Sequence, residues 1–356
     1  MKKLKKFGWY LIIGLVLVSI SLFFCNKIQW LGIALVLLFI LLALVLQTSK
    51  KLKGFSFTVL IFAAVIGALF YPEVFIQIGS FELKKLIIPL LMIIMFGMGT
   101  SMSFLDFVGV VKMPKGVLIG LLLQFTVMPF IGFGLAYVSN LPPEIAAGVI
   151  LVGCSPSGLA SNVMAYISGA NLALSLTLTA VATLLAPLVT PFFMKLLANE
   201  LVPIDFITMF WSIVKIVILP IVLGLLLNHF AKTRITFLNK ILPLVSMAGI
   251  ASIIVIITAA GRDSLLSIGL ILILVVIAHN LCGFLLGYFG GRLCGLDVAS
   301  SRTIAFEVGM QNAGLASGIA LEMGKLATMG LASAVFGPWM NISGSSLASI
   351  WKERKP

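Results

Sequence analysis

The stretch FEVGMQNAGL, residues 306–315, combines an acid, two amides and two glycines within a very apolar part of the chain. Its acid, Glu307, is the only one of the 11 acidic residues that falls deep inside a long apolar stretch. Gly309 weakens a continuous helix at this point, because glycine costs about 1 kcal/mol relative to alanine in a helix interior. We therefore expect a helix that is interrupted beside a buried carboxylate, with Gln311 and Asn312 at the interruption.

The composition around this stretch is that of a membrane protein. Of the 356 residues, 61% are hydrophobic and 10% are charged, whereas soluble domains carry about 25% charged residues. Twelve apolar stretches approach the ~20 residues that a helix needs to cross a bilayer. They are 7–25, 29–47, 55–71, 86–104, 115–138, 144–167, 171–196, 206–229, 241–260, 265–289, 298–323 and 328–351. The pattern predicts an all-α polytopic membrane protein and lacks the short alternating segments of a membrane β-barrel.

The charges predict how the chain lies in the membrane. Although the net charge is +13, Lys and Arg occupy short loops and form no aromatic-interleaved patch, so we expect no nucleic acid partner. If the N-terminus is cytoplasmic, 17 basic residues lie on the cytoplasmic side and 6 on the outer side. This split agrees with the excess of Lys and Arg that cytoplasmic loops of membrane proteins carry. We expect both termini in the cytoplasm, the lipid bilayer of the cell inner (plasma) membrane as surroundings, and no obligatory protein partner. The first apolar stretch lacks a cleavage site and is interpreted as a retained helix.

Short loops leave no room for a soluble domain, so the chain is divided only within its membrane part. The basic cluster at 49–53 separates an N-terminal transmembrane hairpin, residues 1–53, from a ten-helix region, residues 54–356. Each half of that region, about 54–200 and 201–356, has one interrupted polar stretch, fourth of five in both. Such a pair is a sequence sign of the inverted repeats of secondary transporters.

The interrupted stretch of the first half is GCSPSGLASNVMAYISGAN, residues 153–171. Pro156 removes a backbone donor in mid-stretch, and Gly158 adds flexibility. Ser161 and Asn162 then supply oxygen atoms. Asn162 could serve equally as a cap of a half-helix.

Three further polar side chains lie in apolar stretches. Ser175 and Thr179 are four residues apart and share a helix face, and Gln124 interrupts another span. With Glu307 and Gln311 they make an oxygen-rich ligand set that suits a hard monovalent cation better than zinc or copper. The alternatives are that the two hydroxyls bond their own helix and that Gln124 makes an ordinary interhelical hydrogen bond.

Glu307 has no obvious fixed cationic partner in the sequence. Lys215, in the span SIVKIVILP, is the candidate. The alternative for Lys215 is a long side chain that reaches the membrane surface or packs along the helix.

Several long motifs together resemble one known family. They are MFGMGTSMSFLDF, QFTVMP, PPEIAAGVILVGCSPSGLASNV, ALSLTLTAVATLLAPLVTP, IVKIVILPIVLGL, FEVGMQNAGLA and WMNISGSSLA. In this order they resemble the bile acid:sodium symporter family over roughly residues 54–356. The resemblance implies a ten-helix inverted-repeat (5+5) transporter fold with panel and core domains, whose fourth and ninth helices are broken and cross, and two bound sodium ions.

The resemblance also implies site residues. The first sodium site would use Ser161, Asn162, Ser175, Thr179 and Glu307; the second would use Gln124, Glu307, Gln311 and the carbonyls of Val308 and Met310; the substrate site would include Asn312, Asn341, Ser157, Gly158 and Leu159. Relatives often carry Gly-Gly-Thr before Ala-Ser-Asn, so Leu159 replaces a hydroxyl beside the expected substrate site.

These features predict sodium-coupled symport of an organic anion, bile acid-like or a smaller carboxylate, by alternating access. The alternative is a proton-coupled carrier or cation/proton antiporter that uses Glu307 as proton carrier. An intramembrane enzyme is disfavoured, because the chain has no HExxH or GxSxG motif and His229 and His279 are far apart in sequence. A simple channel is the remaining possibility, which saturable sodium-coupled uptake would exclude.

Overall fold

The computed structural model describes residues 2–49, 55–231 and 236–354, with no description of the side chains of 2–7 and 236–240. The helices in chain order are α1 (Lys2–Phe24), α2 (Ile28–Gln47), α3 (Ser56–Phe70), α4 (Glu73–Ile76), η2 (Leu83–Leu86), α5 (Ile87–Ser101), α6 (Phe104–Lys112), α7 (Pro114–Val138), α8 (Pro143–Cys154), α9 (Leu159–Ser168), α10 (Leu172–Ala198), α11 (Phe206–Ile213), η3 (Val214–Ile218), α12 (Leu219–Phe230), α13 (Thr236–Ala260), α14 (Arg262–Leu293), α15 (Val298–Gly309), α16 (Ala313–Glu322) and α17 (Met329–Glu353). The strands are β1 (Gln77–Ile78) and β2 (Phe81–Glu82), paired antiparallel.

Each of the twelve predicted stretches coincides with a helix or with consecutive helical segments. Within the described residues, seven helices are long and apolar enough to cross a membrane, and shorter apolar helices include α3, α8 and α16. Two of the predicted spans, 144–167 and 298–323, are each split into two short helices. Each of these short helices is by itself too short to cross a membrane. The count of twelve crossings therefore stays a prediction.

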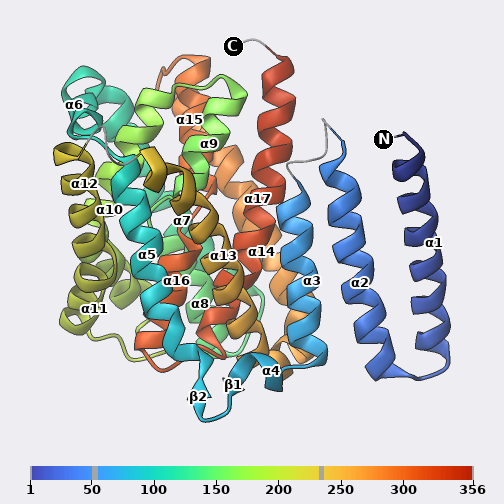
Figure 1. Cartoon of the computed structure of the whole chain (residues 1–356). Coiled ribbons are helices and arrows are strands. Elements are labelled where there is room, and N and C mark those ends of the chain that lie inside the picture. Colours follow the sequence, from blue (N-terminus) through green and yellow to red (C-terminus); the bar gives the residue numbers. More distant parts are fainter. Residues whose placement is uncertain (1, 50–54, 232–235, 355–356) are drawn as a thin grey trace.

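The long helices stand roughly side by side (Figure 1), and they pack in two groups. In one group α5 packs against α12 and α13, and α13 packs against α3. In the other, α7, α14 and α17 pack around the two split helices, α8–α9 and α15–α16. Helix α1 begins and α17 ends at the same end of the molecule (Figure 1).

Glycines allow the closest helix contacts in both groups. Gly283, Gly287 and Gly291 recur every four residues on α14 and face α15; a Cβ atom at Gly283 would lie 2.8 Å from Gly309 Cα. In the other group, a Cβ at Gly99 of α5 would lie 2.1 Å from a backbone oxygen of α12. Small residues at this spacing let helix backbones approach within a bilayer, where packing and hydrogen bonds drive association.

The N-terminal hairpin attaches to the rest of the molecule through α3. Helix α2 lies between α1 and α3 (Figure 1). Ser56 Oγ, at the start of α3, donates to the Ala43 carbonyl of α2 at 2.9 Å, and Tyr71 donates to the Gln29 carbonyl. The predicted boundary at residue 53 lies outside the described residues.

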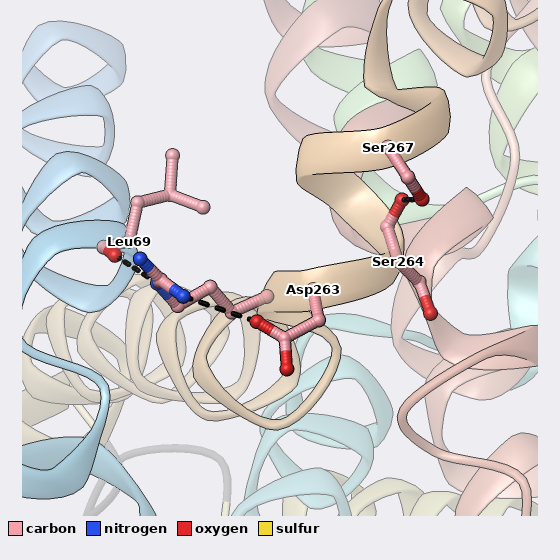
Figure 2. A network of polar contacts seen from close by, with 5 residues as sticks. Leu69, Asp263, Ser264 and Ser267 are labelled. Atoms are coloured by element: carbon pink, nitrogen blue, oxygen red, sulfur yellow. Dashed lines mark hydrogen bonds and ion pairs between the residues drawn. The ribbon is translucent and has the colours of Figure 1, made fainter.

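A polar contact links the far end of α3 to the other group of helices. The Leu69 carbonyl accepts a hydrogen bond of 2.6 Å from Arg262 Nε, and the same guanidinium pairs with Asp263 at 3.0 Å (Figure 2). Arg262 is the first residue of α14. This contact therefore joins the end of α3 to the start of α14.

Some elements were absent from the sequence prediction. Helix α6 lies in a predicted loop, where Ser103 accepts from Leu105 N–H and Asp106 accepts from Ser103 N–H, forming a capping box. The β1–β2 hairpin is similarly short and turns at Gly79, whose φ is +59°. Elements of this size carry too little periodicity for a search based on apolar stretches.

Candidate functional site

The site forms where the two split helices meet. Helix α8 ends at Cys154 and α9 begins at Leu159, while α15 ends at Gly309 and α16 begins at Ala313. Between them the two connecting segments pair as a short antiparallel bridge between Ser157 and Gln311.

Each interruption satisfies the backbone of the other. The N–H of Asn312 donates to the Pro156 carbonyl at 2.8 Å, and the N–H of Gly158 donates to the Met310 carbonyl at 3.3 Å. Backbone groups that leave a helix need such partners inside a membrane protein. Pro156 has no N–H to continue a helix, so its position explains where α8 stops.

Glu307 is 1% exposed and lies at the centre of four hydroxyl groups. The Oγ atoms of Ser157, Ser161 and Ser175 donate to its carboxylate at 2.5, 2.7 and 2.6 Å. The Oγ1 atom of Thr179 donates at 2.9 Å. These donors come from three different segments of the chain, so the cluster exists only in the folded protein.

Asn162 extends this cluster by one more oxygen. Its Oδ1 atom lies within hydrogen-bond distance of two of these hydroxyls, 2.7 Å from Ser175 Oγ and 3.1 Å from Thr179 Oγ1. Asn162 is not the helix cap that was the alternative, because α9 begins after Gly158. Ser175 and Thr179 likewise make no bond to their own helix, whereas Thr183, one turn further along α10, bonds the Thr179 carbonyl at 2.7 Å.

The carboxylate of Glu307 has no cationic partner among the described side chains. The ion pairs found there join Lys84 with Glu82, Arg262 with Asp263 and Lys325 with Glu144. Arg302 is buried on the same helix, but its guanidinium bonds the carbonyls of Ser168, Trp351 and Arg354. Lys215 is exposed and is not its partner.

This donor set fits a small hard cation. Each hydroxyl has one proton, which it gives to Glu307 or Asn162, and keeps lone pairs that a cation can share. Oxygen ligands of carboxylate, amide and hydroxyl type suit hard cations. A buried carboxylate without a counter-charge costs several kcal/mol, which a bound cation would offset.

A second polar cluster adjoins the first near the end of α15. Gln124 Nε2 of α7 donates to Gln311 Oε1 at 2.9 Å and to the Ser155 carbonyl at 3.0 Å. Gln311 Nε2 donates to the Val308 carbonyl at 2.6 Å. The Oε1 atom of Gln124 is buried and has no hydrogen-bond partner among the described residues, so an acceptor is available there for a cation.

A cavity of about 420 Å³ lies beside the crossing, and its lining is mostly apolar. Of the residues expected to contact substrate, Gly158, Leu159, Asn312 and Asn341 line it. Ser157 is not among its lining residues, and its hydroxyl contacts Glu307. The ten-residue helices α9 and α16 both begin at this cavity, so their N-terminal ends contribute partial positive charge where no basic side chain lines the wall.

Two polar residues of the site were missed by sequence reasoning. Asn280 of α14 is fully buried and donates to the Gly309 carbonyl at 2.8 Å, and Ser343 of α17 donates to Asn280 Oδ1 at 2.6 Å. The sequence signal for Asn280 is an amide in the otherwise apolar segment AHNLCG, beside His279. His279 Nε2 instead contacts the Met128 carbonyl at 3.0 Å.

Comparison with known proteins identifies the family of the chain. The sequence profile of the sodium bile acid symporter family matches residues 88–268. The chain belongs to this family. It is 43% identical to the uncharacterized sodium-dependent transporter YocS of Bacillus subtilis, over 85% of this chain and 92% of that protein. With seven apolar helices of spanning length in its described part, it is an integral membrane protein.

Plant proteins are also similar to the chain. The probable chloroplastic sodium/metabolite cotransporter BASS1 of Arabidopsis thaliana is 37% identical, over 75% of this chain and 66% of that protein. The protein of the same name from Oryza sativa is 34% identical, over 88% of this chain and 76% of that protein. The similarity to these relatives therefore reaches well beyond the matched profile.

Proposed function

We propose that the protein is a sodium-coupled symporter that moves an organic anion across the membrane by alternating access. The observation that carries the proposal is the buried Glu307 carboxylate, with four hydroxyl donors and no cationic side chain paired to it in the described part of the chain. Family membership and the printed names of the relatives, a sodium-dependent transporter and sodium/metabolite cotransporters, support sodium as the coupling ion.

Two sodium ions fit the two polar clusters. The first would bind Ser161, Asn162, Ser175, Thr179 and Glu307, and the second would bind Gln124, Glu307, Gln311 and the carbonyls of Val308 and Met310. Ser157 joins the first group in this proposal, because it contacts Glu307. Two sodium ions against one carboxylate leave about one excess positive charge, which a monoanionic substrate at the helix N-termini would offset.

The substrate in this proposal occupies the cavity beside Asn312 and Asn341. Its mostly apolar wall suits an anion with an apolar body. One transport cycle would carry about one net positive charge inward, which is favoured by about 2.3 kcal/mol per 100 mV of inside-negative potential.

Two hollows support alternating access. The lining of the cavity includes Phe57, next to the start of α3, and Ser345, in the second half of α17, and Figure 1 shows the start of α3 and the end of α17 toward the same end of the molecule. A separate hollow of about 360 Å³ lies between α11 and α16, with Asp205 and Glu322 in its wall. Ser317 lines the first hollow and Ile319 the second, so the neighbouring residues of α16 mark the boundary between them.

Helix α16 packs closely against α5 at the residue between Ser317 and Ile319. A Cβ atom at Gly318 of α16 would lie 2.6 Å from Leu91 Cδ1 of α5. If both termini are cytoplasmic, as the basic residues predict, the larger cavity opens inward in this conformation.

We also propose an architecture of two repeats, arranged as a panel and a core. Residues 54–200 and 201–356 would form two inverted five-helix repeats, with α3, α5, α11–α12 and α13 as a panel and the remaining helices as a core. The hairpin of α1 and α2 would be an extension of the panel, because it contacts α3. The cell inner (plasma) membrane, with both termini cytoplasmic, is the proposed location.

The decisive experiment needs no knowledge of the substrate. The purified protein is melted in detergent at increasing sodium, with potassium or choline at equal ionic strength. A saturable rise in melting temperature specific to sodium is expected, since a ligand that binds only the folded state stabilises it. Sodium-driven uptake of organic anions into liposomes then tests coupling. A shift that follows pH but not sodium would instead indicate the proton-coupled carrier.

A further inference from the structure

Asn280 makes a contact at the site that the proposed sodium ligands do not explain. It lies on α14, is fully buried, and uses both ends of its amide. Its Nδ2 atom donates to the Gly309 carbonyl at 2.8 Å, and its Oδ1 atom accepts from Ser343 Oγ at 2.6 Å. One side chain thus joins the end of α15 to α17.

The bond from Asn280 gives the Gly309 carbonyl a partner that its own helix does not supply. Gly309 is the last residue of α15, and carbonyls in the final turn of a helix have no partner within it. The neighbouring carbonyls are directed elsewhere: Val308 accepts from Gln311 Nε2 and Met310 accepts from Gly158 N–H. Asn280 therefore holds the Gly309 carbonyl, which lies in the chain between the two carbonyls proposed as sodium ligands.

Helix packing makes this contact rigid. Gly283, one turn beyond Asn280, is so close to Gly309 that a Cβ atom there would lie 2.8 Å from its Cα. The ring of Phe284, also on α14, packs against Gly309, with Cδ1 2.3 Å from the position of an added Cβ. The end of α15 consequently has little freedom once the amide bond is made.

Ser343 fixes the orientation of the amide. Its hydroxyl donates to Asn280 Oδ1, which directs Nδ2 toward Gly309. Ser343 also lies between Asn341 and Ser345, which both line the cavity. The helix wall of the cavity is therefore connected, through one serine and one amide, to the carbonyls at the break in α15.

We propose that Asn280 is a positioning residue for the second sodium site, which orients the Val308 and Met310 carbonyls by holding that of Gly309, with Ser343 as its anchor on α17. This inference rests on the proposed sodium-coupled function. Some residues orient a metal ligand without binding the metal themselves, and removing such a residue commonly lowers metal affinity 10–100-fold.

The test compares Asn280→Ala with the wild type in the full-length protein. Binding of radiolabelled sodium and the sodium dependence of the melting temperature are measured in detergent. We expect the wild type to bind two ions and Asn280→Ala to lose one of them or to bind it about tenfold more weakly, while the ion at Ser175 and Thr179 remains. Ser343→Ala is expected to weaken the same ion by a smaller factor, because Asn280 keeps its bond to Gly309.

Asn228→Ala provides a matched control. Asn228 Nδ2 also donates to a backbone carbonyl at a helix end, that of Met102, at 2.7 Å, but on α12 and away from the crossing. It is expected to lower thermal stability without changing sodium stoichiometry.

The outcomes separate the two proposals. A wild type without a sodium-specific response would overturn the proposed function itself. A wild type that binds two ions, beside an Asn280→Ala variant with the same stoichiometry and affinity, would overturn the role of Asn280. Equal losses in Asn280→Ala and Asn228→Ala would show a general destabilisation and would also overturn it. If Asn280→Ala does not fold, an unchanged sodium affinity in Ser343→Ala contradicts the proposal.

Discussion

The hydroxyl of Ser175 lies 2.6 Å from Glu307 Oε1, although 132 positions separate the two residues in the chain. The same hydroxyl lies 2.7 Å from Asn162 Oδ1 on a third segment. One small side chain of α10 thus joins both split helices. Substitutions around this contact give the most direct tests of the site.

Glu307→Gln removes the charge of the cluster while keeping its size. We expect the sodium-specific rise in melting temperature to disappear, because the neutral amide no longer compensates a bound cation. At a sodium concentration of 100 times Kd, the loss corresponds to about 2.7 kcal/mol of stabilisation. Glu322→Gln, at an exposed carboxylate of α16, serves as the control. A full sodium response in Glu307→Gln would contradict the site assignment.

Thr179→Val removes a hydroxyl that lies within hydrogen-bond distance of both Glu307 and Asn162. We expect sodium affinity to fall about tenfold, a loss typical of altered metal sites. Thr183→Val is the matched control, because Thr183 is equally buried on α10 but bonds its own helix. Sodium titrations of the melting temperature should separate the two variants. Equal affinities would place the cation elsewhere.

Leu159→Thr tests the wall of the cavity. Leu159 lines the cavity at the start of α9, and no hydrogen bond links it to the Glu307 cluster. We expect the apparent KM for transported anions to change, by about tenfold for a single added or lost polar contact, with sodium affinity unaltered. Uptake into liposomes across a series of organic anions is the measurement. Leu184→Thr, at an exposed position of α10, should leave both quantities unchanged.

Asp297 offers a test of the helix that carries Glu307. It caps α15, and the Ser300 backbone N–H, followed by the Ser300 hydroxyl, holds the pKa of its carboxyl below the usual range. A lowered folded-state pKa gives stability that is present above the unfolded value of about 4 and is lost as pH falls through the folded value. Asp297→Ala should therefore cost about 1 kcal/mol at neutral pH.

The melting temperature of this variant at acidic pH tests the prediction. The melting temperatures of the wild type and Asp297→Ala should begin to converge as the pH falls below about 4 and should meet below the lowered folded-state pKa of Asp297, where the wild-type carboxylate is protonated. Asp263→Ala, at an exposed carboxylate on α14, is the comparison. A constant difference between Asp297→Ala and the wild type at all pH values would show that the cap does not act through its charge.

Sequence reasoning located the two interruptions through individual residues. Pro156 predicted the end of α8 because it has no N–H, and Gly309 is the last residue of α15. It named Ser175 and Thr179 but left open whether their hydroxyls bond their own helix, as the hydroxyl of Thr183 does. It also missed Asn280, whose partners Gly309 and Ser343 lie on other helices.

The sequence by itself determined that the chain consists of apolar helices of membrane length, because a lipid environment requires backbone groups to be bonded within each segment. It also marked one acid inside those helices as exceptional, because an isolated charge is expensive there. Only the tertiary structure decided which oxygens surround Glu307. Hydroxyl groups can bond their own helix or another at similar cost, and the crossing of the two interrupted helices brings Ser157, Ser161 and Ser175 within reach of its carboxylate.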